Sequence, residues 1–369
     1  MLIACSKKLA EELDIKPIAG EPDSNPMFRW SANVVIINRR KAVVAVCDSN
    51  RFGFVLYGMK IKDFDHFASI FLNEIRATML RYGIRPELVD RYVPMDDEVR
   101  CIKLSDKRSI ARMNRAVLFA ENFYDELVPG SLSQPYVTFK MNEDIVSGFG
   151  KDYEYPYMLL FNDFRQSYGY NIFSTKAVDL TVTLNLQRYT AWRRLLIPHC
   201  FTFEQVHHVL QVAFGWKNCH LYEFEILSRQ QGHLRLVADE EDLDSFDTDE
   251  KVFLSTEKKL SDDIGDCADF TYTYDMGDSW EHEIKVNGIV ENYDKNYPVC
   301  IMGEGNAPPE DVGGVGGYID YLDITANPKH PDYQDLKNWS LMQSYEDFSV
   351  ERVNRRLGNI VIGSFEKVY

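Results

Sequence analysis

The sequence predicts an α+β protein in which a separate N-terminal α/β domain precedes a C-terminal β-grasp-like mixed sheet with one packed helix. Three observations lead to this fold class. The chain has 369 residues, which is long for a single hydrophobic core. Residues 64–79 repeat apolar side chains at spacings of three and four, the period of a helix face. Residues 178–186 alternate apolar and polar side chains, the period of a half-buried strand.

The N-terminal α/β domain is expected over residues 1–127. Short apolar runs bounded by Asn, Asp, Ser or Gly are typical of strands. They cover residues 33–38, 42–47 and 52–57. A helix is expected from about Asp63 to Gly83, because glycine suits the C-terminal cap. Pro86 opens the next helix, and residues 107–126 form another.

Residues 128–176 have no sustained period and are expected to form a linker with an ordered, aromatic lead-in to the second domain. Pro129-Gly130 and Tyr155-Pro156-Tyr157 lie within this segment. Proline and glycine interrupt regular structure, which places the domain boundary here.

The C-terminal domain is expected over residues 177–369. Its first strand, residues 178–186, is followed by a return strand that stops at Pro198. Thr202 then suits a helix N-cap with Gln205 as its capping-box partner, and Gly215 ends the helix. The next strand spans residues 220–226, and a hairpin spans residues 272–282.

Composition indicates an acidic, cytoplasmic protein. The formal net charge is −16, and such a surface repels nucleic acid on average, so nucleic acid is not expected as a partner. The seven cysteines are scattered and form no C-x-x-C pair, which argues against disulfides and a zinc knuckle. No apolar run approaches the length of a membrane span, and the N-terminal apolar run is too short for a signal peptide.

The hairpin around Gly277 provides the first half of a candidate site. Side chains alternate across a strand, so Asp278, Trp280 and His282 share one face if the strand starts at Asp278. One interpretation is a pocket beside Trp280 with a polar rim of Asp275, Asp278 and His282. The other is that the aspartates bond the backbone of their own turn and that His282 is a core histidine.

The loop Pro308–Gly314 provides the second half of the site through Glu310 and Asp311. Its prolines restrict the backbone and its glycines free it, so we expect it to present both carboxylates beside the hairpin. Converging carboxylates and imidazoles are ligands that divalent metals accept. The candidate metal ligands are Asp275, Asp278, His282, Glu310 and Asp311.

Two other polar groups stand outside these segments. His220 precedes a strand and could approach His282, but a surface or capping role is the simpler interpretation. A short helix after Ser349 carries Arg352, Arg355 and Arg356 on one side. A solvated face is the simpler interpretation of these arginines on an acidic protein, and phosphate binding is the alternative.

Several blocks of the sequence carry a family resemblance. In the C-terminal half they are Trp192-Arg193-Arg194, Phe214-Gly215-Trp216, the segments 274–282 and 308–314, and Pro298-Val299-Cys300-Ile301. In this order they resemble the plasmid open-reading-frame-three-like family of Ri-plasmid type, from about Ala177 onward. The N-terminal half, through Asn38-Arg39-Arg40-Lys41 and Leu56-Tyr57-Gly58-Met59-Lys60, resembles a bacterial domain of unknown function that precedes this module.

The resemblance implies an α+β fold and an association with plasmids and transposons, and it implies no established activity. Some members of the family carry a transposon-passenger, TnpR-like resolvase label. A serine resolvase needs a nucleophilic serine among arginines, and this sequence has no such arrangement. The net charge of −16 is also unsuited to a recombinase.

Two functions of different classes follow. The first is a cytosolic binding or interaction protein associated with mobile genetic elements, which takes a protein or small ligand at the Asp275–His282 hairpin and the Pro308–Gly314 loop. The alternative is a divalent-metal-dependent hydrolase or nuclease that uses the same cluster. In the alternative, the metal activates water and His282 or a carboxylate moves the proton. A divalent metal is the one cofactor that the sequence suggests.

Overall fold

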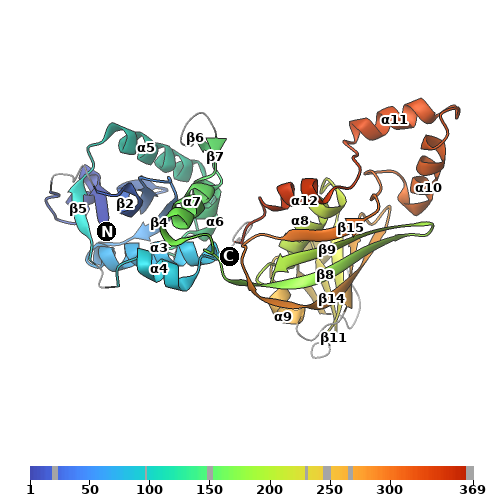
Figure 1. The fold of residues 1–369 in the computed structure, drawn as a ribbon. Helices are drawn as coiled ribbons and strands as arrows, with labels where there is room; N and C mark the ends of the chain where they lie inside the picture. The colour runs from blue at the N-terminus through green and yellow to red at the C-terminus, as the bar shows by residue number, and fades with distance from the viewer. Residues whose placement is uncertain are drawn as a thin grey trace. The chain divides into compact units, whose positions relative to one another are not determined.

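The structure is a computed structural model that describes residues 1–18, 24–95, 98–147, 153–228, 232–243, 251–264 and 269–362. Contacts between Cα atoms divide the chain into two compact units (Figure 1). The first unit contains Met1–Ser174, and the second begins at Thr175. Each unit has its own sheet.

The first unit is built on a five-stranded sheet in the order β4-β3-β2-β1-β5. The strands are β1 (Leu2–Cys5), β2 (Arg29–Ile37), β3 (Arg40–Cys47), β4 (Gly53–Met59) and β5 (Arg100–Lys103). β1 pairs in parallel with both of its neighbours, whereas β2, β3 and β4 form an antiparallel meander. The three strands of the meander are those that the sequence predicts. β1 and β5 have four residues each, too few to show a period.

Helices surround this sheet. They are α1 (Lys7–Glu12), α2 (Ile61–Phe64), α3 (Phe67–Arg81), α4 (Pro86–Tyr92), α5 (Lys107–Asn122), α6 (Pro135–Asn142) and α7 (Pro156–Tyr168). The unit also contains the 3-10 turns η1 (Pro26–Phe28) and η2 (Tyr124–Glu126) and the short strands β6 (Val146–Ser147) and β7 (Tyr153–Glu154). The core of the unit holds the α3 side chains Phe71, Ile75 and Met79, each fully buried as the helical period predicts.

The segment expected to be a linker is instead part of the first unit over residues 128–174. α6 and α7 each begin with a proline, Pro135 and Pro156, at the first helical position, where the missing N–H costs nothing. α6 is bonded to β4: the amide of Gly53 donates to Asn142 Oδ1 at 2.8 Å, and the amide of Val55 donates to Thr138 Oγ1 at 3.1 Å. Pro156, expected from the sequence to interrupt regular structure, therefore starts a helix.

The second unit is built on an eight-stranded sheet in the order β12-β11-β10-β13-β14-β8-β9-β15. The strands are β8 (Thr175–Leu186), β9 (Tyr189–Pro198), β10 (Tyr222–Ser228), β11 (Gly232–Val237), β12 (Lys251–Leu254), β13 (Asp269–Tyr274), β14 (Trp280–Tyr293) and β15 (Val299–Glu304). Every neighbouring pair is antiparallel except β11 and β12, which are parallel. The predicted α+β class and mixed C-terminal sheet are confirmed.

The helices of the second unit are α8 (Phe203–Phe214), α9 (Leu260–Asp263), α10 (Gly314–Thr325), α11 (Tyr333–Met342) and α12 (Val350–Leu357), with the 3-10 turn η3 (Glu240–Asp242). α8 is the packed helix that the sequence predicts. Its Thr202–Gln205 capping box and left-handed Gly215 cap are both present. Phe203 packs edge-on against the buried side chain of Phe224 of β10, so α8 covers the face of the sheet that carries Phe224.

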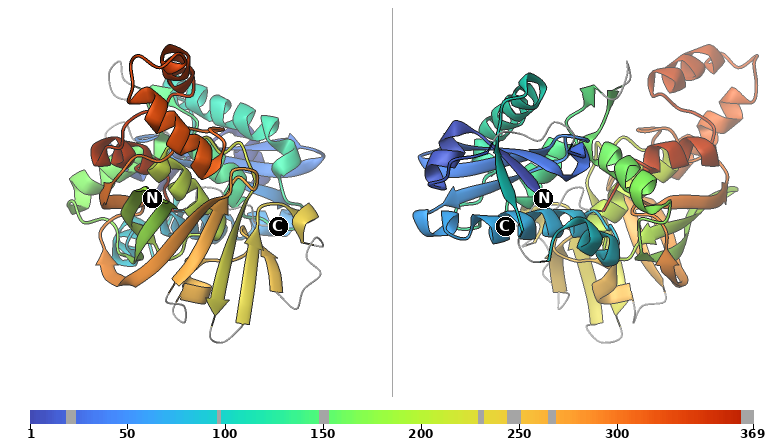
Figure 2. Two further views of the ribbon diagram at one scale, coloured as in Figure 1. Left: turned by 90° about the vertical axis from the view of Figure 1, so that its right-hand side faces the viewer. Right: turned by 60° about the vertical axis from the view of Figure 1, so that its left-hand side comes forward.

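In the described part of this unit, four further helices accompany α8. α12 contacts β15 and α8. α10 and α11, at the orange-red end of the colour range, extend beyond the edge of the sheet in Figure 1 and in the right view of Figure 2. The helix after Ser349 is α12, and the Ser349 side chain caps it by accepting from the amide of Arg352.

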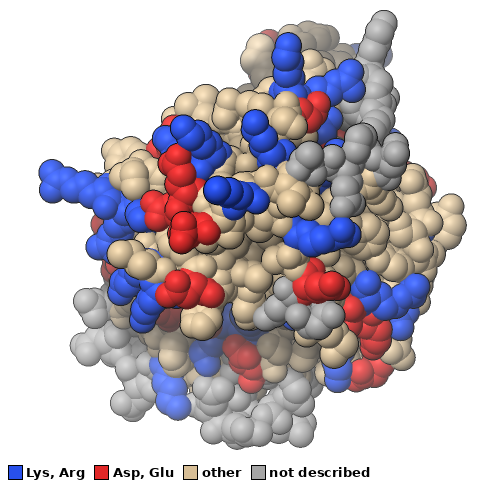
Figure 3. All heavy atoms as spheres, turned by 90° about the vertical axis from the view of Figure 1, so that its left-hand side faces the viewer, with Lys and Arg blue, Asp and Glu red and all other residues tan. Residues whose placement is uncertain are grey.

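Charge is distributed unevenly along the chain. Residues 1–174 carry 23 Lys and Arg and 23 Asp and Glu, whereas residues 175–369 carry 18 and 34. The whole net charge of −16 therefore belongs to the C-terminal half. On the face drawn in Figure 3, basic and acidic side chains of the described residues are interspersed. Within the described parts of the chain, no helix is both long and apolar enough to cross a membrane.

The cysteines of the described ranges are free thiols, as their scattered spacing predicts: Cys5, Cys47, Cys101, Cys200, Cys219 and Cys300. Cys267 lies outside the described residues.

Candidate functional site

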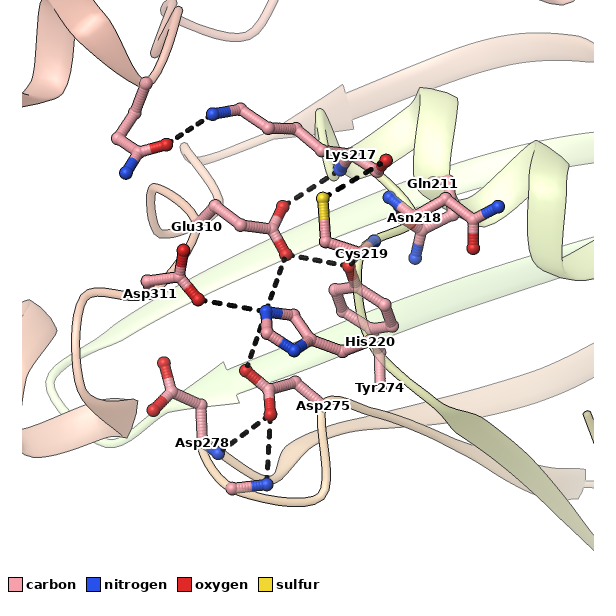
Figure 4. A network of polar contacts seen from close by, with 12 residues as sticks. Gln211, Lys217, Asn218, Cys219, His220, Tyr274, Asp275, Asp278, Glu310 and Asp311 are labelled. Atoms are coloured by element: carbon pink, nitrogen blue, oxygen red, sulfur yellow. Dashed lines mark hydrogen bonds and ion pairs between the residues drawn. The ribbon is translucent and has the colours of Figure 1, made fainter.

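Sheet topology brings three loops to one end of the second sheet. Tyr222 at the start of β10 pairs with Tyr274 at the end of β13, and Tyr274 also pairs with Trp280 at the start of β14. The loop before β10 and the β13–β14 turn therefore lie side by side. The third loop, between β15 and α10, contains the Pro308–Gly314 segment and folds over both (Figure 4).

The β13–β14 turn is organised by Asp275. Its backbone is left-handed, with φ of 56°, a conformation that Asp and Asn tolerate better than other side chains. Asp275 Oδ1 accepts hydrogen bonds from the amides of Gly277 at 3.0 Å and Asp278 at 3.3 Å. The amide of Asp275 donates to Leu221 O at 3.0 Å, which joins the turn to the loop before β10. Asp275 Oδ2 is left to face the other loops.

The Pro308–Gly314 loop is fixed to the turn and to the loop before β10. The amide of Gly313 donates to Asp278 Oδ2 at 3.1 Å. Glu310 is 5% exposed, and both of its oxygens are bonded: Oε1 accepts from the Tyr274 hydroxyl at 2.7 Å, and Oε2 accepts from the amide of Lys217 at 2.9 Å. Burial, together with the neighbouring Glu310 carboxylate, raises the pKa of Tyr274, so its hydroxyl stays protonated and donates.

His220 stands at the centre of the three loops. Its Nε2 lies 2.9 Å from Asp311 Oδ1, 3.6 Å from Asp275 Oδ2 and 3.8 Å from Glu310 Oε1 (Figure 4). One ligand atom each from His220, Asp275 and Asp311 lies within 4.8 Å of the other two. The imidazole is about one-third exposed and Asp311 more than half, so solvent reaches this side of the cluster.

The donor set fits a divalent cation. A metal that binds each ligand atom at about 2.0–2.3 Å separates neighbouring ligand atoms by roughly 3–4 Å. The distance from His220 Nε2 to Asp275 Oδ2, 3.6 Å, falls in this range, and the 2.9 Å to Asp311 Oδ1, a hydrogen-bond distance, lies just below it. One imidazole and two carboxylates are also accepted ligands of zinc and manganese. Three protein ligands leave coordination positions open for water or a substrate.

Two of the predicted site residues lie in the core instead of this cluster. Trp280 is 1% exposed and stacks on Trp216 with ring centroids 5.5 Å apart. His282 is fully buried against Phe214, and its Nδ1 donates to Trp280 O at 2.9 Å. β14 begins at Trp280, so Trp280 and His282 point inward as predicted, whereas Asp278 belongs to the turn and does not share their face.

The structure therefore brings Asp275, Glu310 and Asp311 together, with Asp278 as the support of the loop. It does not bring His282 or Trp280 to them. The imidazole of the cluster is His220, for which a surface or capping role is the simpler expectation from the sequence. His220 reaches the cluster because Tyr222, two residues later, pairs with Tyr274 beside Asp275. This strand pairing cannot be predicted from one sequence, so the sequence gives no sign of the position of His220.

Comparison with known proteins identifies both halves of the chain. Residues 176–356 match the family described as plasmid pRiA4b ORF-3-like protein, and residues 2–159 match a domain of unknown function, DUF6933. The uncharacterized protein y4hQ of Sinorhizobium fredii (strain NBRC 101917 / NGR234) is 34% identical over 169 residues, which cover 46% of this chain and 83% of the relative.

A crystal structure of a protein of unknown function from Methanosarcina mazei Go1 is 27% identical, with a TM-score of 0.42, and covers 48% of this chain and 97% of its own. The descriptions of both relatives name no activity. The family resemblance predicted from the sequence blocks is confirmed. Residues 2–159 match DUF6933, and through residues 176–356 this chain belongs to the plasmid pRiA4b ORF-3-like family.

Proposed function

We propose that this protein is a binding protein whose C-terminal domain takes a divalent cation at His220, Asp275 and Asp311. The observation that carries the proposal is the convergence of these three ligand atoms from three separate loops, each within 4.8 Å of the others. The buried side chain of Glu310 adds negative charge next to these three residues. We do not count it as a ligand, because both of its oxygens already accept hydrogen bonds.

The competing account of the cluster is a polar network in which His220 is hydrogen-bonded to the carboxylates around it. The two accounts differ in the effect of an added cation, which stabilises the folded protein only if it binds there.

The hydrolase alternative uses the same ion and adds a group that moves a proton. His282, one of the two candidates for that task, has no access to the ion because it is buried against Phe214. A carboxylate of the cluster is the remaining candidate. Binding without catalysis therefore needs fewer groups, and we place it first. An association with mobile genetic elements also stays a proposal, supported by the plasmid in the family description.

The test is the binding of Mn²⁺ and Zn²⁺ to the metal-free full chain by isothermal titration calorimetry. We expect one site per chain. Asp275→Asn keeps the Oδ1 acceptor that holds the turn and removes the charge, and His220→Ala removes the imidazole. Each change should weaken binding at least about tenfold, the loss of roughly one ligand's contribution.

His330→Ala is the matched control, because His330 is a half-exposed histidine of the same unit outside the cluster. Its affinity for both ions should equal that of the wild type. If the wild type binds neither ion, or if His220→Ala binds as well as His330→Ala, the cation site is wrong and the polar network accounts for the cluster.

A further inference from the structure

Among the described residues, one buried arginine of the second unit has no carboxylate partner. Arg193 of β9 is 1% exposed, and in the described part of the chain its guanidinium bonds to backbone carbonyl oxygens and not to an Asp or Glu oxygen. Burial lowers the pKa of Arg193 to about 10, so it still carries its charge at neutral pH. A buried charge is normally paired, so a guanidinium without a carboxylate partner that lines a pocket is a candidate site for an anion.

The groups that do hold Arg193 leave one nitrogen unused. Nε donates to Ala213 O at 2.9 Å, at the C-terminal end of α8. Nη1 donates to Trp192 O at 2.8 Å and to Glu304 O at 3.0 Å. The rings of Phe214 and Phe348 lie 4.9 and 3.5 Å from the guanidinium carbon. Within the described parts of the chain, nothing accepts a hydrogen bond from Nη2.

Arg193 lines a pocket between the end of α8, the segment before α12 and α12 itself. The arginines that the sequence analysis singled out, Arg352 and Arg356, line it too. Glu346 is paired with both, at 2.8 Å from Arg352 and 3.6 Å from Arg356. Asp347, another lining residue, accepts a hydrogen bond from Asn306 Nδ2 at 2.8 Å.

The charges of the lining leave one positive charge in excess. Three arginines face two carboxylates, and both carboxylates are already engaged with other side chains. One singly charged anion balances this excess, whereas a doubly charged anion reverses its sign. A carboxylate also matches the planar N–H geometry of a guanidinium edge.

We propose that this pocket binds a carboxylate group whose oxygens accept hydrogen bonds from Arg193 Nη2. The carboxylate comes from a small carboxylic acid or from the C-terminal end of a peptide. The site shares no residue with the cation cluster, so it stands or fails independently of the proposed function.

Titration of the full chain with acetate, N-acetylglycylglycine and inorganic phosphate at constant ionic strength tests the proposal. The readout is the ¹H–¹⁵N signal of Arg193 Nε, assigned through its loss in Arg193→Lys. We expect saturable shifts with acetate and the peptide but not with phosphate. Tighter binding of the peptide identifies a peptide terminus as the ligand, and equal binding identifies a small acid.

Val212→Phe keeps Arg193 and fills the pocket from α8 at a half-exposed position, so folding should be retained. This variant should weaken acetate binding at least about tenfold. Val286→Phe, a half-exposed β14 position outside the lining, should leave it unchanged. A shift that saturates only with phosphate, no saturable shift at all, or equal binding by both variants overturns the proposal.

Discussion

His282 keeps a neutral imidazole inside the core. Its Nδ1 faces two carbonyl oxygens, Trp280 O and Tyr272 O, so this nitrogen carries the proton. Its Nε2 is enclosed and meets no partner among the described residues. Protonation of Nε2 would place a charge and an unpaired donor in the core, and burial accordingly lowers the pKa of His282 to about 4.

This lowered pKa predicts a loss of stability in acid. The unfolded chain binds a proton at His282 near pH 6.5, whereas the folded chain does so only near pH 4, so stability falls as the pH falls between these values. At pH 5 the loss from this residue is on the order of 2 kcal/mol. His282→Gln keeps a donor for Trp280 O and should remove this part of the pH dependence. Urea unfolding at pH 7 and pH 5 measures it.

His330→Gln is the control for the pH experiment, since His330 is half-exposed. Its unfolding free energy should depend on pH as the wild type's does. An unchanged pH dependence in His282→Gln would show that this imidazole titrates normally despite its burial. A part of the acid sensitivity should survive in any case, because burial also lowers the pKa of His207, to about 3.

Some residues of the candidate site can be predicted from local sequence patterns, and others cannot. Asp275, Glu310 and Asp311 lie in Gly- and Pro-rich segments whose local chemistry marks them in the sequence. His220 carries no such signal, because its position depends on which strands pair. The strand period correctly places His282 on one face with Trp280. It does not tell a core face from a pocket face, and this face is the core.

At the scale of elements, local rules predict the helices and strands that carry a complete signal. The Thr202–Gln205 capping box starts α8 as predicted, and the alternation of residues 178–186 lies within β8. α6 and α7 escape prediction because Pro135 and Pro156 are equally compatible with a turn and with a helix start. β1 and β5 gain their stability from neighbours far along the chain, which no local pattern records.

The start of α10 offers a matched pair of glycines for testing how this helix positions the cation cluster. A Cβ at Gly317 would lie 2.0 Å from Val312 O, whereas a Cβ at Gly316 meets nothing within 4 Å. Gly317→Ala should therefore displace Val312 together with the adjacent Asp311. We expect Mn²⁺ binding by calorimetry to weaken at least about tenfold, and the free energy of unfolding to fall by roughly 1–3 kcal/mol.

Gly316→Ala replaces glycine by the best helix former in open space. It should leave Mn²⁺ binding unchanged and raise the free energy of unfolding by up to about 1 kcal/mol. Equal affinities in the two variants would mean that α10 does not position Asp311. Loss of binding in both would point to the flexibility of the glycines instead.

At the scale of the whole molecule, the two halves differ in charge as well as in fold. Residues 1–174 are balanced in charge, and residues 175–369 carry the entire net charge of −16. The field of the C-terminal half attracts cations, and salt screens it. The composition of the whole chain conceals this difference: repulsion of nucleic acid by net negative charge is expected of the C-terminal half and not of the N-terminal half.

The proposed cation site uses residues of the second unit alone, and this predicts that residues 175–369 bind Mn²⁺ without the rest of the chain. The dissociation constant by calorimetry should agree with that of the full chain within about twofold. Thermal unfolding of the fragment by circular dichroism should be cooperative. A cooperatively folded fragment that binds much more weakly than the full chain would show that the first unit contributes to the site.

The left-handed backbone at Asp275 and Asp311, with φ of 56° and 57°, limits what chemistry the cluster can acquire. A β-branched or bulky side chain is strained in this conformation, whereas Gly, Asn and Asp adopt it readily. Glycine supplies no ligand atom, so the useful choice at each position lies between a carboxylate and an amide of nearly the same shape. Charge is therefore the property of these two positions that can change while the loops keep their form.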